Sequence, residues 1–256
     1  MRSEVVKSLM LFVVATILIQ VFYVVMASFD LNAEGRYFPL GYIVHIVYYL
    51  SLFAATFLFV GKLDFAAVGL KRVPLWGLYL TVGLAFALLN HAVKILIFQG
   101  TFEPTALPTE LNIPAYLLLG LLIGLAEESA FRGYILQNFL KKYTPILALL
   151  ASSILFGIYH VNFFDLNYFT LYFWGLYVVQ TLTGGIFMGV LYFKTGKNLV
   201  APIAYHSSQI IIGQITGWTP GVDTNLFLAA ATIINLVQTA FLVLLPLPGR
   251  KNKELL

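Results

Sequence analysis

The sequence contains no cysteine. Disulfide bonds, thiolate zinc sites and cysteine nucleophiles are therefore all excluded. Charge is also scarce, because only 10% of the 256 residues are charged, against about 25% in an ordinary soluble domain. Hydrophobic residues make up 60% of the chain. The remaining polar residues are too few to cover the surface of a soluble protein of this size. The composition therefore predicts a membrane protein.

Several other patterns are missing. The short alternating segments of a transmembrane β-barrel do not occur, and the net charge of +4 lies mainly in the loops and gives no indication of nucleic-acid binding. The first apolar stretch, within "MRSEVVKSLMLFVVATILIQVFYVVMA", is too long for a signal peptide and lacks an A-x-A cleavage site. We therefore expect it to be retained as a first membrane span.

Apolar runs of about twenty residues, the length needed to cross a bilayer as a helix, recur along the chain. They predict an all-α, polytopic transmembrane helix bundle with about eight spans. The connections are short, so we expect one integral membrane domain (1–256), with N-terminal spans in 1–112, the chemistry-bearing core in 113–217 and the last span and tail in 218–256. The expected spans are Val5–Ala27, Leu40–Val60, Leu75–Phe98, Ile113–Leu140, Pro145–His160, Tyr168–Phe193, Leu199–Gly217 and Asn225–Pro246.

Basic residues predict the orientation. They gather before the first span and in every second connection, whereas the other connections carry almost none except Arg36. Because cytoplasmic loops are enriched in lysine and arginine, both termini are expected in the cytoplasm. The residues concerned are Arg2, Lys7, Lys62, Lys71, Arg72, Lys141, Lys142, Lys194, Lys197, Arg250, Lys251 and Lys253.

Two acidic residues, Glu127 and Glu128, lie deep within a predicted span. A charge at the centre of a bilayer costs about 2.5–3.5 kcal/mol even on the most lenient scale, so such residues are candidates for function. Glu128 and Arg132 are four positions apart on one helical face and are expected to form an ion pair. Glu127 points about 100° away from Glu128 and needs a partner from another helix or a polar cavity.

The histidines are the candidate partners of Glu127. At about 1.5 Å per residue, Glu127 and His160 each lie about 20 Å from the cytoplasmic ends of their helices, and His206 lies about 13 Å from its own. A carboxylate and two imidazoles can act as general base and oxyanion or proton-transfer groups on a water molecule. Glu127, His160 and His206 would instead be the ligands if a zinc ion activates the water. Neither the H-E-x-x-H motif of zinc proteases nor the G-x-S-x-G motif of serine hydrolases occurs. The three residues alone therefore predict a buried hydrolytic site and do not decide whether it contains a metal ion.

Three motifs resemble those of the CAAX protease and bacteriocin-processing family, also called the Abi or type II CAAX prenyl endopeptidase family. "EESAFRG" is similar to its E-E-x-x-x-R motif, and "FGIYH" to its F-x-x-x-H motif, with Phe156 and His160 at the two fixed positions. "TGGIFMGVLYFKTGKNLVAPIAYHSSQ" resembles the third region, which ends in a histidine, here His206. The resemblance covers about Leu118 to Gly213.

The resemblance implies an intramembrane endopeptidase that acts on membrane-associated or prenylated peptides or proteins. By this analogy Glu127 activates the attacking water, His160 assists, and His206 helps to bind the oxyanion. Glu128 and Arg132 would hold the first motif in shape, and Phe156 would pack near the site. The family has been described both as metal-dependent and as a metal-independent glutamate type, so a zinc cofactor stays open.

One position departs from the family pattern. The third motif usually continues as H-x-x-x-N or H-x-x-x-D, but the fourth residue after His206 is Ile210, which has no hydrogen-bonding group. Gln209, on a neighbouring face, or Asn162, just after His160, would then supply a substitute amide. Without a substitute, the oxyanion site has one donor fewer.

Two other classes of function compete with proteolysis. A non-catalytic membrane scaffold, or an immunity or regulatory protein that keeps the fold, is favoured by Ile210, whereas the intact set of buried charges argues against it. A proton-coupled transporter could use buried Glu and His residues, but no inverted repeat is evident. The expected partners are a peptide or protein substrate, lipidated or not, and the lipid bilayer, with no nucleic acid; the expected location is integral to the membrane, which in a prokaryote means the plasma membrane.

Overall fold

A computed structural model describes residues 2–29, 38–98, 101–102, 112–163, 171–216, 218–219 and 221–247. The described chain is almost entirely helical, so the predicted all-α class is confirmed. The described residues also contain two short strands, β1 (Thr101–Phe102) and β2 (Trp218–Thr219), which pair in antiparallel orientation. The helices are α1 (Arg2–Ser28), α2 (Phe38–Val60), α3 (Trp76–Phe98), α4 (Asn112–Glu128), α5 (Gln137–Leu140), α6 (Pro145–Tyr159), α7 (Leu171–Lys194), α8 (Val200–Thr216) and α9 (Thr224–Leu244), and a π-helical segment, η2 (Ser129–Leu136), joins α4 to α5.

The helices form at the predicted places. Within the described residues, six are long and apolar enough to cross a membrane: α1, α2, α3, the continuous α4–η2–α5, α7 and α9. Helix α6 has 15 residues and is shorter, and α8 is not among the six. The protein is thus a multi-pass integral membrane protein. The predicted start of the sixth span at Tyr168 and the basic tail at Arg250, Lys251 and Lys253 lie outside the described residues.

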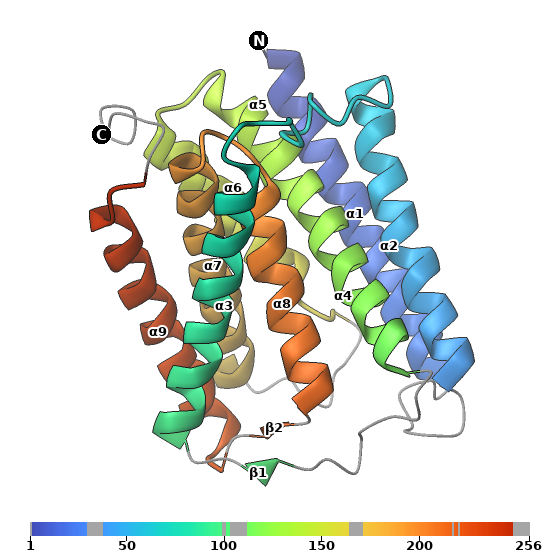
Figure 1. Cartoon of the computed structure of the whole chain (residues 1–256). Helices are drawn as coiled ribbons and strands as arrows, with labels where there is room; N and C mark the ends of the chain where they lie inside the picture. Colours follow the sequence, from blue (N-terminus) through green and yellow to red (C-terminus); the bar gives the residue numbers. More distant parts are fainter. Residues whose placement is uncertain are drawn as a thin grey trace.

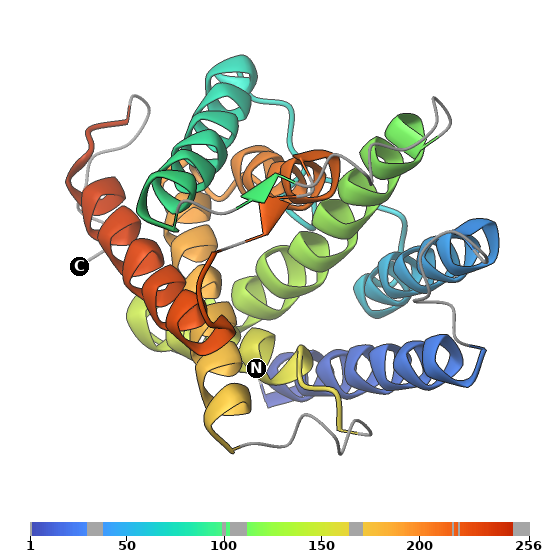
Figure 2. The same cartoon turned by 90° about the horizontal axis from the view of Figure 1, so that it is seen from below.

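Successive long helices run in opposite directions, so the start of α1 and the end of α9 lie at the same end of the bundle (Figure 1). Seen along the bundle in Figure 2, α8 lies between α3 and α4, while α1 and α2 form one flank and α7 and α9 the other. The helix that carries His206 is therefore packed against α3 and α4, and also contacts α7.

Two helix starts follow local sequence rules. Thr144 precedes α6, and its Oγ1 accepts a hydrogen bond from the backbone N–H of Leu147 at 3.4 Å, with Pro145 in the first turn. Asp223 caps α9 by accepting from the backbone N–H of Asn225 at 2.8 Å. Side-chain oxygens before a helix satisfy amide groups that have no partner within it, and a proline in the first turn has no such amide to lose.

Glycines let α8 approach its neighbours closely. A Cβ atom on Gly83 of α3 would collide with the backbone oxygen of Ala201, and one on Gly124 of α4 would collide with Ser207. Small residues at such crossings let helix backbones pack tightly inside membranes. The backbone of α8 is therefore held against both α3 and α4.

The start of α8 is also tied to the loop before α3. The N–H of Leu199 donates to the carbonyl of Gly69 at 3.1 Å, and the amide of Asn198 donates to the carbonyl of Lys71 at 2.8 Å. Asn198 and Leu199 are both buried. Helix α8 therefore begins inside the bundle and not at its surface, which sets the depth of His206.

Candidate active site

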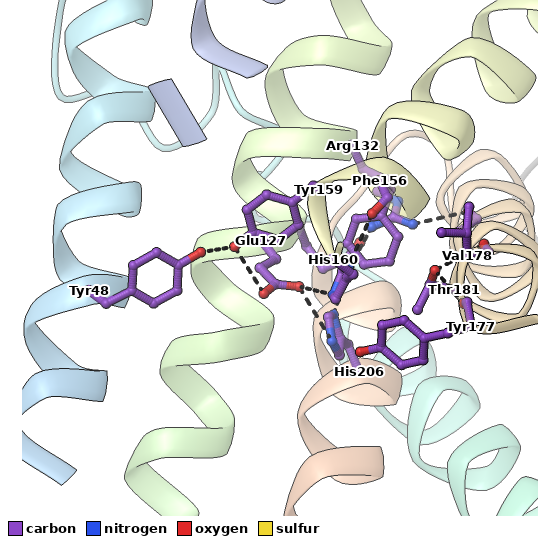
Figure 3. Close-up of polar contacts among 12 residues, drawn as sticks. Tyr48, Glu127, Arg132, Phe156, Tyr159, His160, Tyr177, Val178, Thr181 and His206 are labelled. Atoms are coloured by element: carbon purple, nitrogen blue, oxygen red, sulfur yellow. Dashed lines mark hydrogen bonds and ion pairs between the residues drawn. The ribbon is translucent and has the colours of Figure 1, made fainter. Parts of the chain in front are cut away.

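The structure brings the three predicted residues Glu127, His160 and His206 together from α4, the end of α6 and α8 (Figure 3). The Oε2 atom of Glu127 lies 3.7 Å from Nε2 of His160 and 3.8 Å from Nε2 of His206. Glu127 is 2% exposed, and this oxygen has no hydrogen-bond partner among the described residues. At these separations one water molecule can bridge the carboxylate and an imidazole.

His160 is the C-terminal cap of α6, and its other ring nitrogen fixes its orientation. Nδ1 lies 2.7 Å from the backbone oxygen of Phe156, which can only accept a hydrogen bond. Nδ1 therefore carries the proton. In the neutral ring Nε2 then has a free lone pair, and this is the atom that faces Glu127.

His206 is oriented by the second glutamate of the motif. Its Nδ1 lies 2.9 Å from Oε1 of Glu128, and the same oxygen accepts a hydrogen bond from Nη1 of Arg132 at 2.8 Å. The predicted ion pair between Glu128 and Arg132 is thus present, and both side chains are buried. A carboxylate on one ring nitrogen fixes the ring and stabilises its protonated form, so Glu128 also acts on the imidazole that faces Glu127.

Arg132 and Phe156 connect this network to α7. Nη2 of Arg132 donates to the backbone oxygen of Gly185 at 3.1 Å, and its guanidinium lies over the Phe156 ring, 4.3 Å from the ring centre. The edge of the same ring packs on His160, with 4.5 Å between ring centres. Phe156 therefore lies at the site as the motif predicted. Gly185 leaves room for the guanidinium, because a Cβ there would lie 3.3 Å from Nη2.

A tyrosine that was not among the predicted site residues contacts the Glu127 carboxylate directly. The hydroxyl of Tyr159 donates to Oε1 of Glu127 at 3.3 Å, and it is also hydrogen-bonded to the hydroxyl of Tyr48 in α2 (Figure 3). Tyr159 is fully buried. It immediately precedes His160 in "FGIYH", and this position within the motif is the sequence feature from which its place at the site could have been predicted. With Oε1 held by Tyr159, the other oxygen of Glu127 faces the two histidines.

The three residues open onto a cavity of about 380 Å³. Its walls come from α1, α2, α3, α4, α6, α7, α8 and α9. Polar side chains that the sequence analysis did not select also line it: Tyr23, Tyr49, Tyr177, Gln180, Thr181 and Asn235. They lie on four different helices, so no sequence motif links them.

The amides proposed to replace the missing motif residue have different environments. Ile210 lines the cavity, and so does Gln209, but the Gln209 amide donates to the backbone oxygen of Ala87 in α3 at 3.0 Å. Asn162 is not among the residues that line the cavity. Asn235 of α9 does line it, with its amide donating to the backbone oxygen of Gln180 at 3.2 Å.

The alternative to a site made of protein groups alone is a zinc site. Within the described ranges, no group of three or more His, Asp or Glu side chains has an arrangement suited to a metal ion. Nδ1 of each histidine is directed to a protein oxygen, and the two Nε2 atoms and Oε2 of Glu127 form the face of the site.

An all-helical membrane bundle with a buried carboxylate facing two oriented imidazoles across a polar cavity has the groups that acid–base chemistry on water requires. Residues 109–210 match the sequence model of the Rce1-like family, described as type II CAAX prenyl endopeptidase Rce1-like. All three motifs lie within the matched segment, and the resemblance found in the sequence is thereby confirmed. No curated protein matches the chain.

Proposed function

We propose that the protein is an intramembrane endopeptidase of the CAAX type, which hydrolyses peptide bonds of membrane-associated peptides or proteins with a water activated by Glu127. The observation that carries the proposal is the free Oε2 atom of Glu127, which faces Nε2 of both His160 and His206 in a cavity within the membrane bundle. The family match supports the same reaction class.

In the proposed reaction, Glu127 takes a proton from the water as its oxygen attacks the substrate carbonyl carbon. The carbonyl oxygen becomes an oxyanion, to which Nε2–H of His206 donates a hydrogen bond. Glu128 supports this donor by stabilising the protonated ring through Nδ1. Nε2 of His160 accepts a hydrogen bond from the second hydrogen of the water and so orients its oxygen for attack. Glu127 then returns its proton to the leaving nitrogen as the C–N bond breaks.

The reaction proposed here uses protein groups alone, with no step through a metal ion. A chelator should therefore leave the cleavage rate of purified protein unchanged, and metal analysis should find less than one zinc per chain. Loss of activity in chelator that is restored by stoichiometric zinc would show that Glu127, His160 and His206 act as metal ligands instead.

We further propose that the whole chain forms one membrane domain that crosses the bilayer eight times, with both termini in the cytoplasm. The loops rich in lysine and arginine all lie at the end of the bundle where α1 starts and α9 ends (Figure 1), as the positive-inside rule requires. Because these 256 residues contain no cysteine, single introduced cysteines report the topology directly. Cysteine in place of Gly221 should react with an impermeant reagent on intact cells, and cysteine in place of Lys62 only after permeabilisation.

The function is tested by comparing new peptide N-termini in host membranes that carry wild-type protein or Glu127→Gln at matched levels. Termini present only with the wild type identify the substrate and support the assignment of Glu127 as the general base. If both membranes give the same termini while both proteins are folded, the chain is not a protease of this kind.

A non-catalytic scaffold is the second candidate, and the observation that favours it is Ile210. This apolar side chain lines the cavity at the position where the family pattern has an amide or a carboxylate. A scaffold would give no new termini in the same comparison. It would instead keep its partner bound in both the wild type and Glu127→Gln, which co-purification in mild detergent measures.

A further inference from the structure

Within the described residues, no acidic side chain pairs with Lys94 of α3. Lys94 lines the same cavity as Glu127, His160 and His206. It makes no ion pair or hydrogen bond within the described part of the chain, and its Nζ atom lies over the Phe227 ring, 5.7 Å from the ring centre. Of the described residues that line the cavity, Glu127 is the one acid and Lys94 the one lysine or arginine.

An unpaired ammonium is costly in a membrane span and marks a functional position by default. A cation–π contact with one aromatic ring offsets only part of the lost hydration. Basic side chains near helix ends can often extend to the bilayer surface, but Lys94 instead lines the internal cavity. The environment therefore favours an anion that enters the cavity from outside the protein.

The position of Lys94 relative to the candidate catalytic residues is fixed. One turn earlier on α3, Nε2 of His91 donates to the backbone oxygen of Gln209 at 3.3 Å, and the Gln209 side chain donates to the backbone oxygen of Ala87 at 3.0 Å. Gln209 follows His206 by three residues on α8. These two bonds hold the α3 segment that carries Lys94 against the helix that carries His206.

We propose that Lys94 is a specificity-determining residue that binds a carboxylate of the substrate, either the C-terminal carboxylate of a peptide or an acidic side chain. The Glu127 carboxylate repels such a group and Lys94 attracts it, so the two residues orient the substrate along the cavity. A peptide would then lie with its anionic group at Lys94 and its scissile bond at Glu127. This inference rests on the proposed function, because it assigns a substrate class to the same site.

The test uses randomised-sequence quenched peptides in matched batches. One batch ends in a free carboxylate and one in a carboxamide, and each is made with either glutamate or glutamine at the acidic positions. The proteins are the wild type, Lys94→Met, Lys94→Arg and Lys142→Met. Lys142 is the matched control because its Nζ also lies over an aromatic ring, 5.2 Å from the centre of Tyr143, but it lies outside the cavity.

The wild type is expected to cleave the batches that carry the recognised carboxylate about 10-fold to 100-fold faster, the range for a hydrogen bond to a charged group. Lys94→Met should lose that preference while keeping its rate on the uncharged batch, Lys94→Arg should keep most of it, and Lys142→Met should match the wild type. A preference for the free C-terminus identifies the main-chain carboxylate, and a preference for glutamate identifies the side chain.

Two outcomes overturn the proposal. The wild type cleaves all batches at one rate, or Lys94→Met slows every batch equally, as a purely structural lysine would. If the wild type cleaves no batch, the proposed function is wrong. The anion-binding role of Lys94 is then tested separately, by measuring how tightly Glu127→Gln binds the same peptides. If Glu127→Gln binds the carboxylate peptides more tightly than the uncharged ones, and Glu127→Gln/Lys94→Met does not, Lys94 is an anion-binding residue. If both variants bind all batches equally, the proposal for Lys94 is wrong.

Discussion

His206 and Glu128 are joined by a hydrogen bond of 2.9 Å between Nδ1 and Oε1, and Arg132 donates to the same oxygen at 2.8 Å. One carboxylate thus pairs with the arginine on its own helix and orients an imidazole on another. The two adjacent glutamates divide the work: Glu128 supports the site through its neighbours, and Glu127 faces the cavity.

Replacing Glu127 by glutamine should remove cleavage without unfolding the protein. The amide cannot accept a proton from water, and loss of a general base costs about 10²–10⁴ in rate. The substitution removes a buried charge and keeps the side-chain volume. Turnover of a cleaved peptide and thermal unfolding in detergent are measured together. Normal turnover would show that another group activates the water.

Replacing Arg132 by alanine should lower both the yield of folded protein and the activity. It leaves the carboxylate of Glu128 buried without its arginine, and breaking a buried ion pair in this way costs about 3–5 kcal/mol. Fluorescence-detected size exclusion measures the folded fraction. The double variant Arg132→Ala/Glu128→Gln removes the stranded charge and should recover stability but not activity, because His206 still lacks its carboxylate. Equal stability of the single and double variants would contradict the stranded-charge explanation.

Tyr159→Phe should lower kcat by about 10-fold, the effect of 1.4 kcal/mol, with little change in KM. The hydroxyl holds Oε1 of Glu127 at 3.3 Å, and Tyr159 is fully buried and does not line the cavity. Tyr48→Phe is the control, because it leaves the donor to Glu127 in place and should cause a smaller loss. A change confined to KM would indicate that Tyr159 affects substrate binding and not the base.

Ile210→Asn should raise turnover. The side chain lines the cavity, so an amide there can reach solvent or an oxyanion, and one oxyanion donor is worth up to about 10²–10³ in kcat. Ile210→Leu adds no donor and should leave the rate as it is. If the asparagine variant is no faster, the site already has its full complement of donors, and Asn235 on the same cavity becomes the residue to replace next.

Gly124→Ala should destabilise the protein by about 1–3 kcal/mol, the usual cost of overpacking. The added methyl group would collide with Ser207, the residue next to His206, so activity should fall as well. Gly213→Ala on α8 is the matched control, because its Cβ would meet nothing within 4 Å. That variant should gain up to about 1 kcal/mol from helix propensity. Two equal melting temperatures would show that α8 is not seated on Gly124.

Much of the site could be predicted because it lies in local motifs. Helix spacing predicted the pair of Glu128 and Arg132, and the resemblance of the three motifs implied that Glu127, His160 and His206 share one site. Depth was harder, because the estimate placed His206 about 7 Å nearer the cytoplasmic end than Glu127. The difference arises because Leu199 is already buried, so α8 starts inside the bundle.

Other contacts could not be read from the sequence because they depend on how distant helices pack. The bond between His206 and Glu128 joins residues 78 positions apart, and that between Tyr48 and Tyr159 joins residues 111 apart. Lys94 was visible as a polar residue in an apolar span, but its place on the cavity depends on the crossing of α3 and α8. The π-helical segment likewise has no marker in "SAFRGYIL".

That segment has a consequence for how the chain tolerates changes in length. A helix closed by bonds from residue i to i+5 contains an extra residue compared with an α-helix. Deleting one residue between Ser129 and Leu136 can therefore be absorbed by a change of helix type, whereas a deletion within α4 turns Glu127 by about 100° away from the histidines. A deletion of one residue that leaves a working site should thus fall in the π-helical segment after Glu128 and not in α4.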